Sequence, residues 1–161
     1  KTGEIYVAGM KEMVFACVII GLANSISILL EDGMIMDTIV YGLFGPLQNF
    51  SPAVSGVLMM VSHTLLHFPV PSYSGQAILT LPILVPLSDL IGLSRQICVL
   101  AYQYGAIMPD MIVPTNGALM AIIAIAKIPY NKWFKSALKP TSLMLLIGAV
   151  TIIVAVAMGY N

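Results

Sequence analysis

Two stretches decide the fold: PVPSYSGQA at Pro69–Ala77 and PDMIVPTNG at Pro109–Gly117. Each contains two prolines, a glycine and hydroxyl or amide side chains, and each interrupts an apolar background. Proline lacks a backbone N–H and clashes with the preceding helical turn, so neither stretch is expected to stay α-helical. We therefore predict two places where a pair of apolar helical segments meets at a polar break.

The composition around these breaks indicates a protein surrounded by lipid. Of the 161 residues, 59% are hydrophobic and 9% are charged, and the mean hydropathy is +0.97. Soluble domains carry roughly 25% charged residues, so an ordinary soluble domain is excluded. The net charge is zero and no basic block occurs, which argues against nucleic-acid binding. We expect an all-α integral membrane protein.

The spacing of charges and prolines predicts the order of segments. We expect a membrane helix at 13–30, a short or interfacial helix at 34–50, a helical hairpin at 51–93 with its tip at 70–76, a broken membrane helix at 96–126, a cytoplasmic amphipathic segment at 128–139 and a membrane helix at 140–160. The lysines of 128–139 orient the chain, since basic loops stay in the cytoplasm. The hairpin is either re-entrant or a pair of full spans, because both return the chain to the same side. The chain begins at Lys1 without a signal-peptide pattern, so we expect it to be part of a larger carrier.

The two breaks together indicate a binding site. Secondary transporters expose unwound backbone and half-helix N-termini near the bilayer midplane. The side chains of Ser72, Ser74, Gln76, Thr115 and Asn116 would supply neutral donors and acceptors there. The alternative is that both breaks are kinks in a packed bundle that binds nothing.

Asp110 is the one charged residue of the broken segment 96–126. A carboxylate inside a membrane is costly and usually functional. Asp110 would hold an ammonium or guanidinium group, ligate a sodium ion or carry a proton, unless buried polar groups satisfy it for structural reasons alone.

His63 and His67 stand four residues apart and share one helix face. No third zinc ligand is visible nearby, so we expect no metal site. A proton relay and a purely packed role both remain open for these histidines. The sequence contains no nucleophile elbow, phosphate-binding loop or cysteine metal motif, and we expect neither an enzyme nor a cofactor.

The residues VPSYSGQAILTLPILVPLSDLIGLSRQICVLAYQYG at Val70–Gly105, followed by IVPTNGALM and IAKIPYNKWFK, carry a family resemblance. The chain resembles the C-terminal half of a carrier in the YfcC-like branch of the four-carbon dicarboxylate anaerobic carrier family. That resemblance implies an inverted-repeat secondary transporter of the bacterial inner membrane, multi-pass, assembled as a homodimer and working by an elevator movement. By position, Ser72, Ser74, Gly75 and Gln76 resemble the hairpin tip, and Pro114, Thr115, Asn116 and Gly117 resemble the unwound stretch. The sequence departs from the family at Tyr73, where a small residue is expected, and at Ala106–Asp110.

The sequence therefore favours a secondary active transporter of a small carboxylate-bearing metabolite. No lysine or arginine lies at membrane depth, whereas Asp110 does, so we favour exchange of a basic amino acid of the arginine or ornithine type. The alternatives are a four-carbon dicarboxylate carrier coupled to Na⁺ or H⁺, a channel or pore-lining subunit, and a membrane scaffold without a ligand. The expected partners are the N-terminal half of the same carrier, a second copy and the lipid bilayer.

Overall fold

The computed structural model describes residues 2–160, apart from the side chains of ten residues of the first helix. Every regular element within these residues is helical. In chain order they are α1 (Thr2–Asp32), α2 (Met36–Phe44), η1 (Gly45–Asn49), α3 (Pro52–Leu66), α4 (Tyr73–Leu90), α5 (Arg95–Ile107), η2 (Met108–Met111), α6 (Gly117–Ile125) and α7 (Tyr130–Ala157), where η marks a short 3-10 helix. The all-α prediction is confirmed for this part of the chain.

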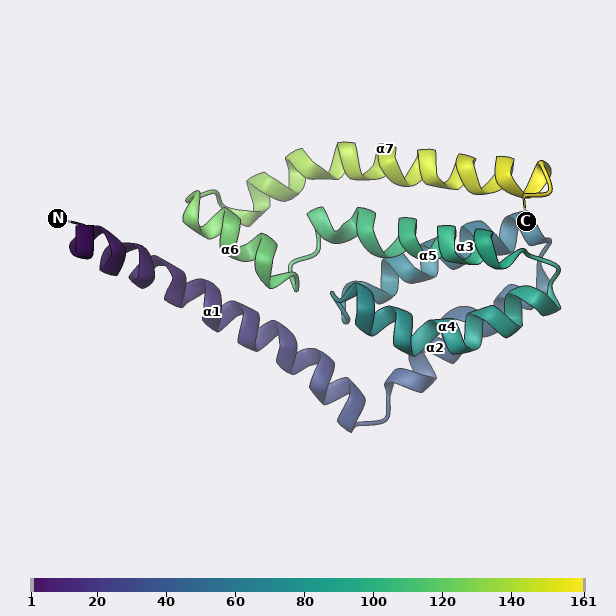
Figure 1. Cartoon of the computed structure of the whole chain (residues 1–161), viewed down its shortest axis with the longest axis horizontal. Helices are drawn as coiled ribbons and strands as arrows, with labels where there is room; N and C mark the ends of the chain where they lie inside the picture. The colour runs from purple at the N-terminus through teal and green to yellow at the C-terminus, as the bar shows by residue number, and fades with distance from the viewer. Residues whose placement is uncertain (1, 161) are drawn as a thin grey trace.

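Helix α5 is central to the bundle because it packs against α3, α4 and α7. The two hairpin arms, α3 and α4, contact α5 more than they contact each other. In Figure 1, α7 runs along one side of the bundle, while α1 slants away from it with α6 beside its N-terminal part. The apolar core accordingly lies around α5 rather than between the hairpin arms.

The contact between α3 and α5 depends on small residues. A Cβ atom added to Gly105 of α5 would lie 2.3 Å from the carbonyl oxygen of Met60 and 2.6 Å from the Cβ of His63. Gly56 of α3 similarly faces Ile152 of α7, where an added Cβ would approach Cγ2 to 2.9 Å. Small residues at such positions let helices approach closely, which is how helices associate in membranes.

Both breaks occur in the structure. Helix α3 ends at Leu66, the chain runs through 67–72 without regular structure beyond a turn, and α4 begins at Tyr73. Helix α5 ends at Ile107, the single turn η2 follows, and α6 begins at Gly117 after 112–116. The expected tip at 70–76 is wrong in its second half, because residues 73–76 already form the first turn of α4, which the Ser72 side chain caps. We call 67–72 the tip and 108–116 the unwound stretch. Both lie near the middle of the molecule along its long axis (Figure 1).

The structure differs from the sequence expectation at both ends of the chain. Where a separate amphipathic segment at 128–139 and a span from 140 were expected, one helix runs from Tyr130 to Ala157 with Pro140 inside it. A proline removes one N–H, and bundled helices tolerate that loss where neighbours support the backbone. Helix α1 begins at Thr2 rather than near residue 13, since glutamate and lysine are good helix formers and mark a polar end without stopping the helix.

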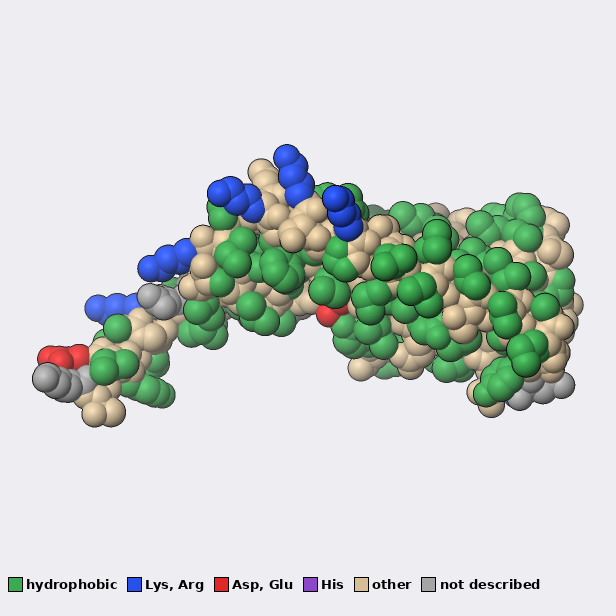
Figure 2. Space-filling model, turned by 90° about the horizontal axis from the view of Figure 1, so that it is seen from above, with side chains coloured by type: hydrophobic (Ala, Val, Ile, Leu, Met, Phe, Trp, Pro, Cys, Tyr) green, Lys and Arg blue, Asp and Glu red, His purple; other side chains and the backbone are tan. Residues whose placement is uncertain are grey.

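Exposed lysines gather around one part of the surface. Lys127, Lys132, Lys135 and Lys139 are all exposed around the start of α7, and Figure 2 shows basic side chains gathered toward that part of the visible face, with many hydrophobic side chains over the remainder. By length and composition α7 is a candidate membrane span, and no other helix among the described residues meets that criterion.

Candidate functional site

The tip and the unwound stretch meet through direct hydrogen bonds. The hydroxyl of Thr115 donates to the carbonyl oxygen of Phe68 at 2.5 Å. His67 of the tip likewise lies 3.0 Å from the carboxylate of Asp110 in the unwound stretch. Tyr102 of α5 donates its hydroxyl to the carbonyl oxygen of Tyr73, the first residue of α4, at 2.6 Å. The segments are 47 residues apart at the first of these contacts, so the fold brings the two sequence breaks into one place.

Two helices begin at this junction, and a polar side chain caps each of them. The Ser72 hydroxyl accepts from the N–H of Gly75 at 3.2 Å at the start of α4. The side-chain oxygen of Asn116 accepts from the N–H groups of Ala118 at 2.9 Å and Leu119 at 3.2 Å at the start of α6. Helix N-termini carry partial positive charge, so the junction has a weakly positive backbone environment.

Asp110 lies at the centre of the junction and accepts hydrogen bonds from three different segments. His67 Nε2 lies 3.0 Å from Oδ1, and Asn116 Nδ2 donates to the same oxygen at 2.6 Å. The hydroxyl of Tyr73 donates to Oδ2. A carboxylate has about four acceptor positions, and these donors fill most of them. The contacts described for Asp110 therefore fix the direction of its two oxygens.

Asp110 has no partner with a fixed positive charge among its described contacts. They come from a histidine, a tyrosine and an asparagine, none of them a lysine or arginine. Its side chain remains 26% exposed, whereas that of His67 is fully buried. The carboxylate is thus accessible from one edge and offers a negative charge to a group that reaches it there.

A buried second layer holds His67 in place. The side-chain amide of Gln76 donates through Nε2 to the carbonyl oxygen of Val70 at 3.2 Å and lies 3.1 Å from His67 Nδ1. The ring of His67 stacks on Tyr73 with centroids 5.6 Å apart and planes 10° apart. Gln76 is completely buried, so it supports His67 from inside rather than facing the open edge of Asp110.

The structure places the other sequence-predicted residues at or next to the junction with different exposures. Gly75 lies inside the capped first turn of α4, and Gly117 opens α6. The side chains of Ser74 and Pro114 are exposed. Thr115 and Asn116 have the junction contacts given above. All nine predicted residues therefore lie on the tip side or the unwound side of one junction, with Gln76 turned inward.

Tyr73 and Tyr102 contribute contacts that sequence reasoning did not assign to the site. Tyr73 departs from the family pattern, and that departure is the available signal. The four-residue spacing of His63 and His67 draws attention to His67, but its partner Asp110 is 43 residues away. Tyr102 gave no signal, because one tyrosine among seven carries no pattern.

Two side chains of α7 donate hydrogen bonds to the backbone of the unwound stretch. Tyr130 donates its hydroxyl to the carbonyl oxygen of Ile112 at 2.6 Å, and Trp133 donates its indole N–H to the carbonyl oxygen of Met111 at 2.8 Å. Irregular backbone in a membrane must have such partners. These carbonyl groups are therefore satisfied within the fold.

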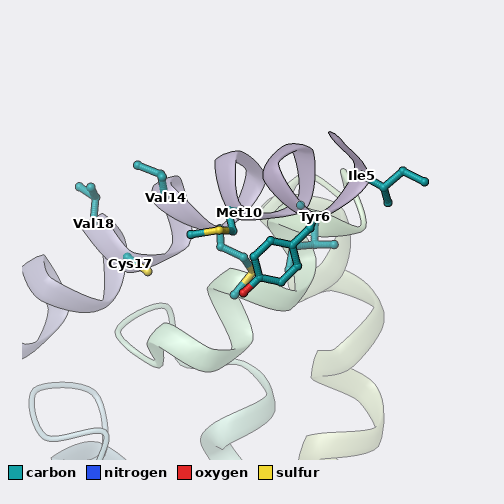
Figure 3. Close-up of a pocket in the computed structure, with 9 residues that line it drawn as sticks. Ile5, Tyr6, Met10, Val14, Cys17 and Val18 are labelled. Carbon is teal, nitrogen blue, oxygen red and sulfur yellow. The ribbon is translucent and has the colours of Figure 1, made fainter. Parts of the chain in front are cut away.

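One hollow of the described surface lies away from this junction. It measures about 940 Å³ and is lined by the first half of α1 together with Ile125 of α6. Figure 3 shows apolar side chains of α1, including Tyr6, Met10 and Val14, around it. Its described lining residues are uncharged.

Comparison with known proteins gives the family. The sequence profile of the DcuC family, described as C4-dicarboxylate anaerobic carrier, matches residues 1–157. The chain belongs to this family. The name of the family is that of a carrier and not of an enzyme, and the resemblance drawn from the sequence is confirmed.

Two relatives refine the comparison. A protein of Escherichia coli named "Putative basic amino acid antiporter YfcC" is 31% identical over 161 residues, which cover 97% of this chain and 32% of that protein. An uncharacterized protein of Haemophilus influenzae is 34% identical over 155 residues, covering 96% of this chain and 30% of that protein. The chain thus spans about a third of the length of these relatives. No solved structure matches it.

Proposed function

We propose that this chain forms part of a secondary active transporter that exchanges a small carboxylate-bearing metabolite, namely a basic amino acid of the arginine or ornithine type. The family match supports a carrier. The observation that carries the substrate class is Asp110, a carboxylate that is 26% exposed and has no lysine or arginine among its described partners. An ammonium or guanidinium group would supply the missing positive charge through a charge-assisted hydrogen bond.

The carboxylate end of such a substrate requires a different part of the junction. The N-termini of α4 and α6 both open there, and helix N-termini favour anionic groups. Ser74 is exposed in the first turn of α4 and would add a hydroxyl donor. The substrate then lies with its cation at Asp110 and its carboxylate toward these helix ends.

The remaining features of the carrier are part of the same proposal. The N-terminal half of the carrier would supply an inverted repeat and complete the site, in a multi-pass protein of the bacterial inner membrane. Two copies would assemble as a homodimer, with an elevator movement of the substrate domain and Na⁺ or H⁺ as a coupling ion. The exposed apolar side chains of α1 and α7, for example Leu22 and Leu146, are compatible with contact to lipid or to the rest of the carrier.

A four-carbon dicarboxylate carrier is the second candidate, and the family description favours it. A dicarboxylate would need a cationic partner in place of the carboxylate of Asp110. The lysines at the start of α7 are exposed on the surface. The cationic partner of a dicarboxylate would therefore have to come from the rest of the carrier.

Transport by the full-length carrier tests the two candidates directly. The carrier is reconstituted in liposomes preloaded with unlabelled arginine or succinate, and uptake of labelled arginine and succinate is followed with and without a sodium gradient. We expect saturable arginine uptake stimulated by internal arginine. Succinate uptake without arginine uptake would contradict the proposal and favour the dicarboxylate carrier, and flux without saturation or exchange would indicate a channel.

Asp110→Asn tests the residue that carries the proposal. The amide keeps the shape of the side chain and removes its charge, so we expect arginine affinity to fall about 10- to 100-fold, which is the scale of one hydrogen bond to a charged group. Asp89→Asn is the matched control, because Asp89 is an exposed carboxylate that pairs with Arg95 outside the junction. Equal arginine affinity in Asp110→Asn and the wild type would contradict the assignment.

A further inference from the structure

Behind the open edge of Asp110, the junction contains a row of buried polar groups that substrate binding alone does not require. Asp110 Oδ1 lies 3.0 Å from His67 Nε2, and His67 Nδ1 lies 3.1 Å from the amide nitrogen of Gln76. His63 is a direct neighbour of Gln76. His67, His63 and Gln76 are completely buried, so the open edge of Asp110 is the part of the row that solvent reaches.

Hydrogen-bond donors fix the proton positions in this arrangement. The amide nitrogen of Gln76 can only donate, so His67 Nδ1 accepts. The ring proton of a neutral His67 is then on Nε2, which donates it to Asp110. A neutral imidazole next to a carboxylate leaves the pair with one negative charge.

Three buried polar atoms of this row have no hydrogen-bond partner in the present arrangement. The side-chain oxygen of Gln76 and both ring nitrogens of His63 are buried without a hydrogen-bond partner. Rotation of the Gln76 amide by half a turn would present that oxygen to His67 Nδ1 and turn the NH₂ group away from it. The amide would then accept from a protonated His67, in exchange for its hydrogen bond to the carbonyl oxygen of Val70. The row thus has hydrogen-bonding capacity for one additional proton.

We propose that the His67–Asp110 pair binds one proton, and that this proton and the cationic group of the substrate bind in competition. The inference rests on the proposed function and adds its coupling ion. The proton adds either to the open carboxylate edge or to His67 Nδ1, and the titration belongs to the pair as a unit. Either occupant brings the charge of the pair from −1 to zero.

Competition for one charge explains why exchange would be obligatory. An uncompensated carboxylate at membrane depth is costly, so the site moves across the membrane readily only when a proton or a substrate cation occupies it. Histidine is the side chain that changes charge near neutral pH. The carrier would therefore exchange a basic substrate for a proton or for another basic substrate.

The other ionisable groups around the His67–Asp110 pair form the following contacts. Tyr73 of α4 donates to Asp110, and Tyr102 of α5 donates to the backbone of Tyr73. On the α7 side, Tyr130 donates to a carbonyl oxygen of the unwound stretch, and the lysines of α7 are exposed. His63 of α3 packs against Phe44 and Tyr102, with ring centroids 5.0 and 5.2 Å away, and has no described contact with Asp110.

Calorimetry of arginine binding to the full-length carrier in lipid nanodiscs tests the competition. Titrations in two buffers of different ionisation enthalpy, repeated at several pH values, give both the affinity and the number of protons released. We expect about one proton released per bound arginine on the acidic side, with affinity falling about tenfold for each pH unit. Arginine binding without proton release at any pH would overturn the inference.

Two variants assign the proton to the pair. In His67→Gln the amide still donates to Asp110 but the titrating ring is gone, so the acidic loss of affinity should begin at lower pH than in the wild type. Asp89→Asn is the matched control and should keep the wild-type pH profile. An unchanged pH profile in His67→Gln would overturn the role of His67. If that variant does not fold, the number of protons released by the wild type still tests the competition.

The experiment separates this inference from the function on which it rests. Arginine binding that is independent of pH would leave the basic amino acid carrier intact and remove proton competition. Absence of arginine binding at every pH would contradict the proposed function and the inference together. Proton release coupled to arginine binding supports both.

Discussion

Helix α3 contacts its neighbours in two very different ways along its length. Near its middle, Met60 and His63 meet Gly105 of α5 so closely that a Cβ at Gly105 would lie 2.3 Å from a backbone oxygen. Just beyond its C-terminal end, His67 meets Asp110 through a hydrogen bond of 3.0 Å. We call the first the dry contact and the second the polar junction.

The two regions should fail for different reasons when they are altered. The dry contact is defined by volume, because closely packed backbone has no flexible group that can move aside. The polar junction is defined by which atoms donate and which accept, because each buried polar group needs a partner. Changes of size should therefore act on stability at the dry contact, and changes of charge or donor should act on transport at the polar junction.

The largest effect is expected from Gly105→Ala at the dry contact. The new methyl group would lie 2.3 Å from the carbonyl oxygen of Met60, so α3 and α5 must move apart, at a cost of about 1–3 kcal/mol or more. The free energy of unfolding in detergent measures it. Gly42→Ala in α2 is the control, since a Cβ there meets nothing within 4 Å and alanine favours a helix by up to about 1 kcal/mol. Equal stability of both variants would show that the dry contact has room to adjust.

The fold was predictable mainly where proline and glycine leave no helical alternative. PVPSYSGQA and PDMIVPTNG predicted both breaks, and α3 and α5 end next to them, although residues 73–77 of the first stretch are helical. The predicted segment boundary at Pro140 is wrong, because α7 continues through this residue. The first turns of α7 are held by contacts distant in sequence, since Tyr130 and Trp133 donate hydrogen bonds to carbonyl oxygens of the unwound stretch. No local sequence pattern predicts such contacts.

The sequence predicted which segments form the site but not the hydrogen bonds that join their side chains. Asp110 stood out because a lone carboxylate is conspicuous in an apolar segment, and Asn116 because it lies in a break. The link from Asp110 to His67 spans 43 residues and depends on how α5 packs between the two breaks. Gln76 was expected to offer its amide to a ligand, yet it is completely buried behind His67.

A smaller effect is expected at Asn116, which serves both stability and the polar junction. Its side-chain oxygen caps α6, and its NH₂ group donates to Asp110 at 2.6 Å. Asn116→Ala removes both contacts and should lower the free energy of unfolding by about 1 kcal/mol, the usual value of an N-cap. Arginine affinity should fall as well, because the orientation of the carboxylate is released.

Asn116→Ser separates the two roles. Serine is as good an N-cap as asparagine but has a shorter side chain without an NH₂ group, so unfolding should return to the wild-type value while arginine affinity stays reduced. Chemical unfolding and arginine calorimetry on the same preparation measure the two quantities. Recovery of both by serine would mean that the cap alone matters, and that the polar junction depends on helix position rather than on the donor.

The smallest effect is expected where a charged pair lies outside both regions. Arg95 donates to Asp89 through two hydrogen bonds of 3.0 and 2.7 Å, a geometry at least as good as that of His67 and Asp110. Both side chains are exposed, at 69% and 45%, so water competes for each of them and salt screens the attraction. Arg95→Gln should therefore leave stability and arginine affinity unchanged at moderate salt. If it reduced transport as strongly as Asp110→Asn, burial would not be what distinguishes the polar junction, and the turn between α4 and α5 would have to contact the substrate or move with it.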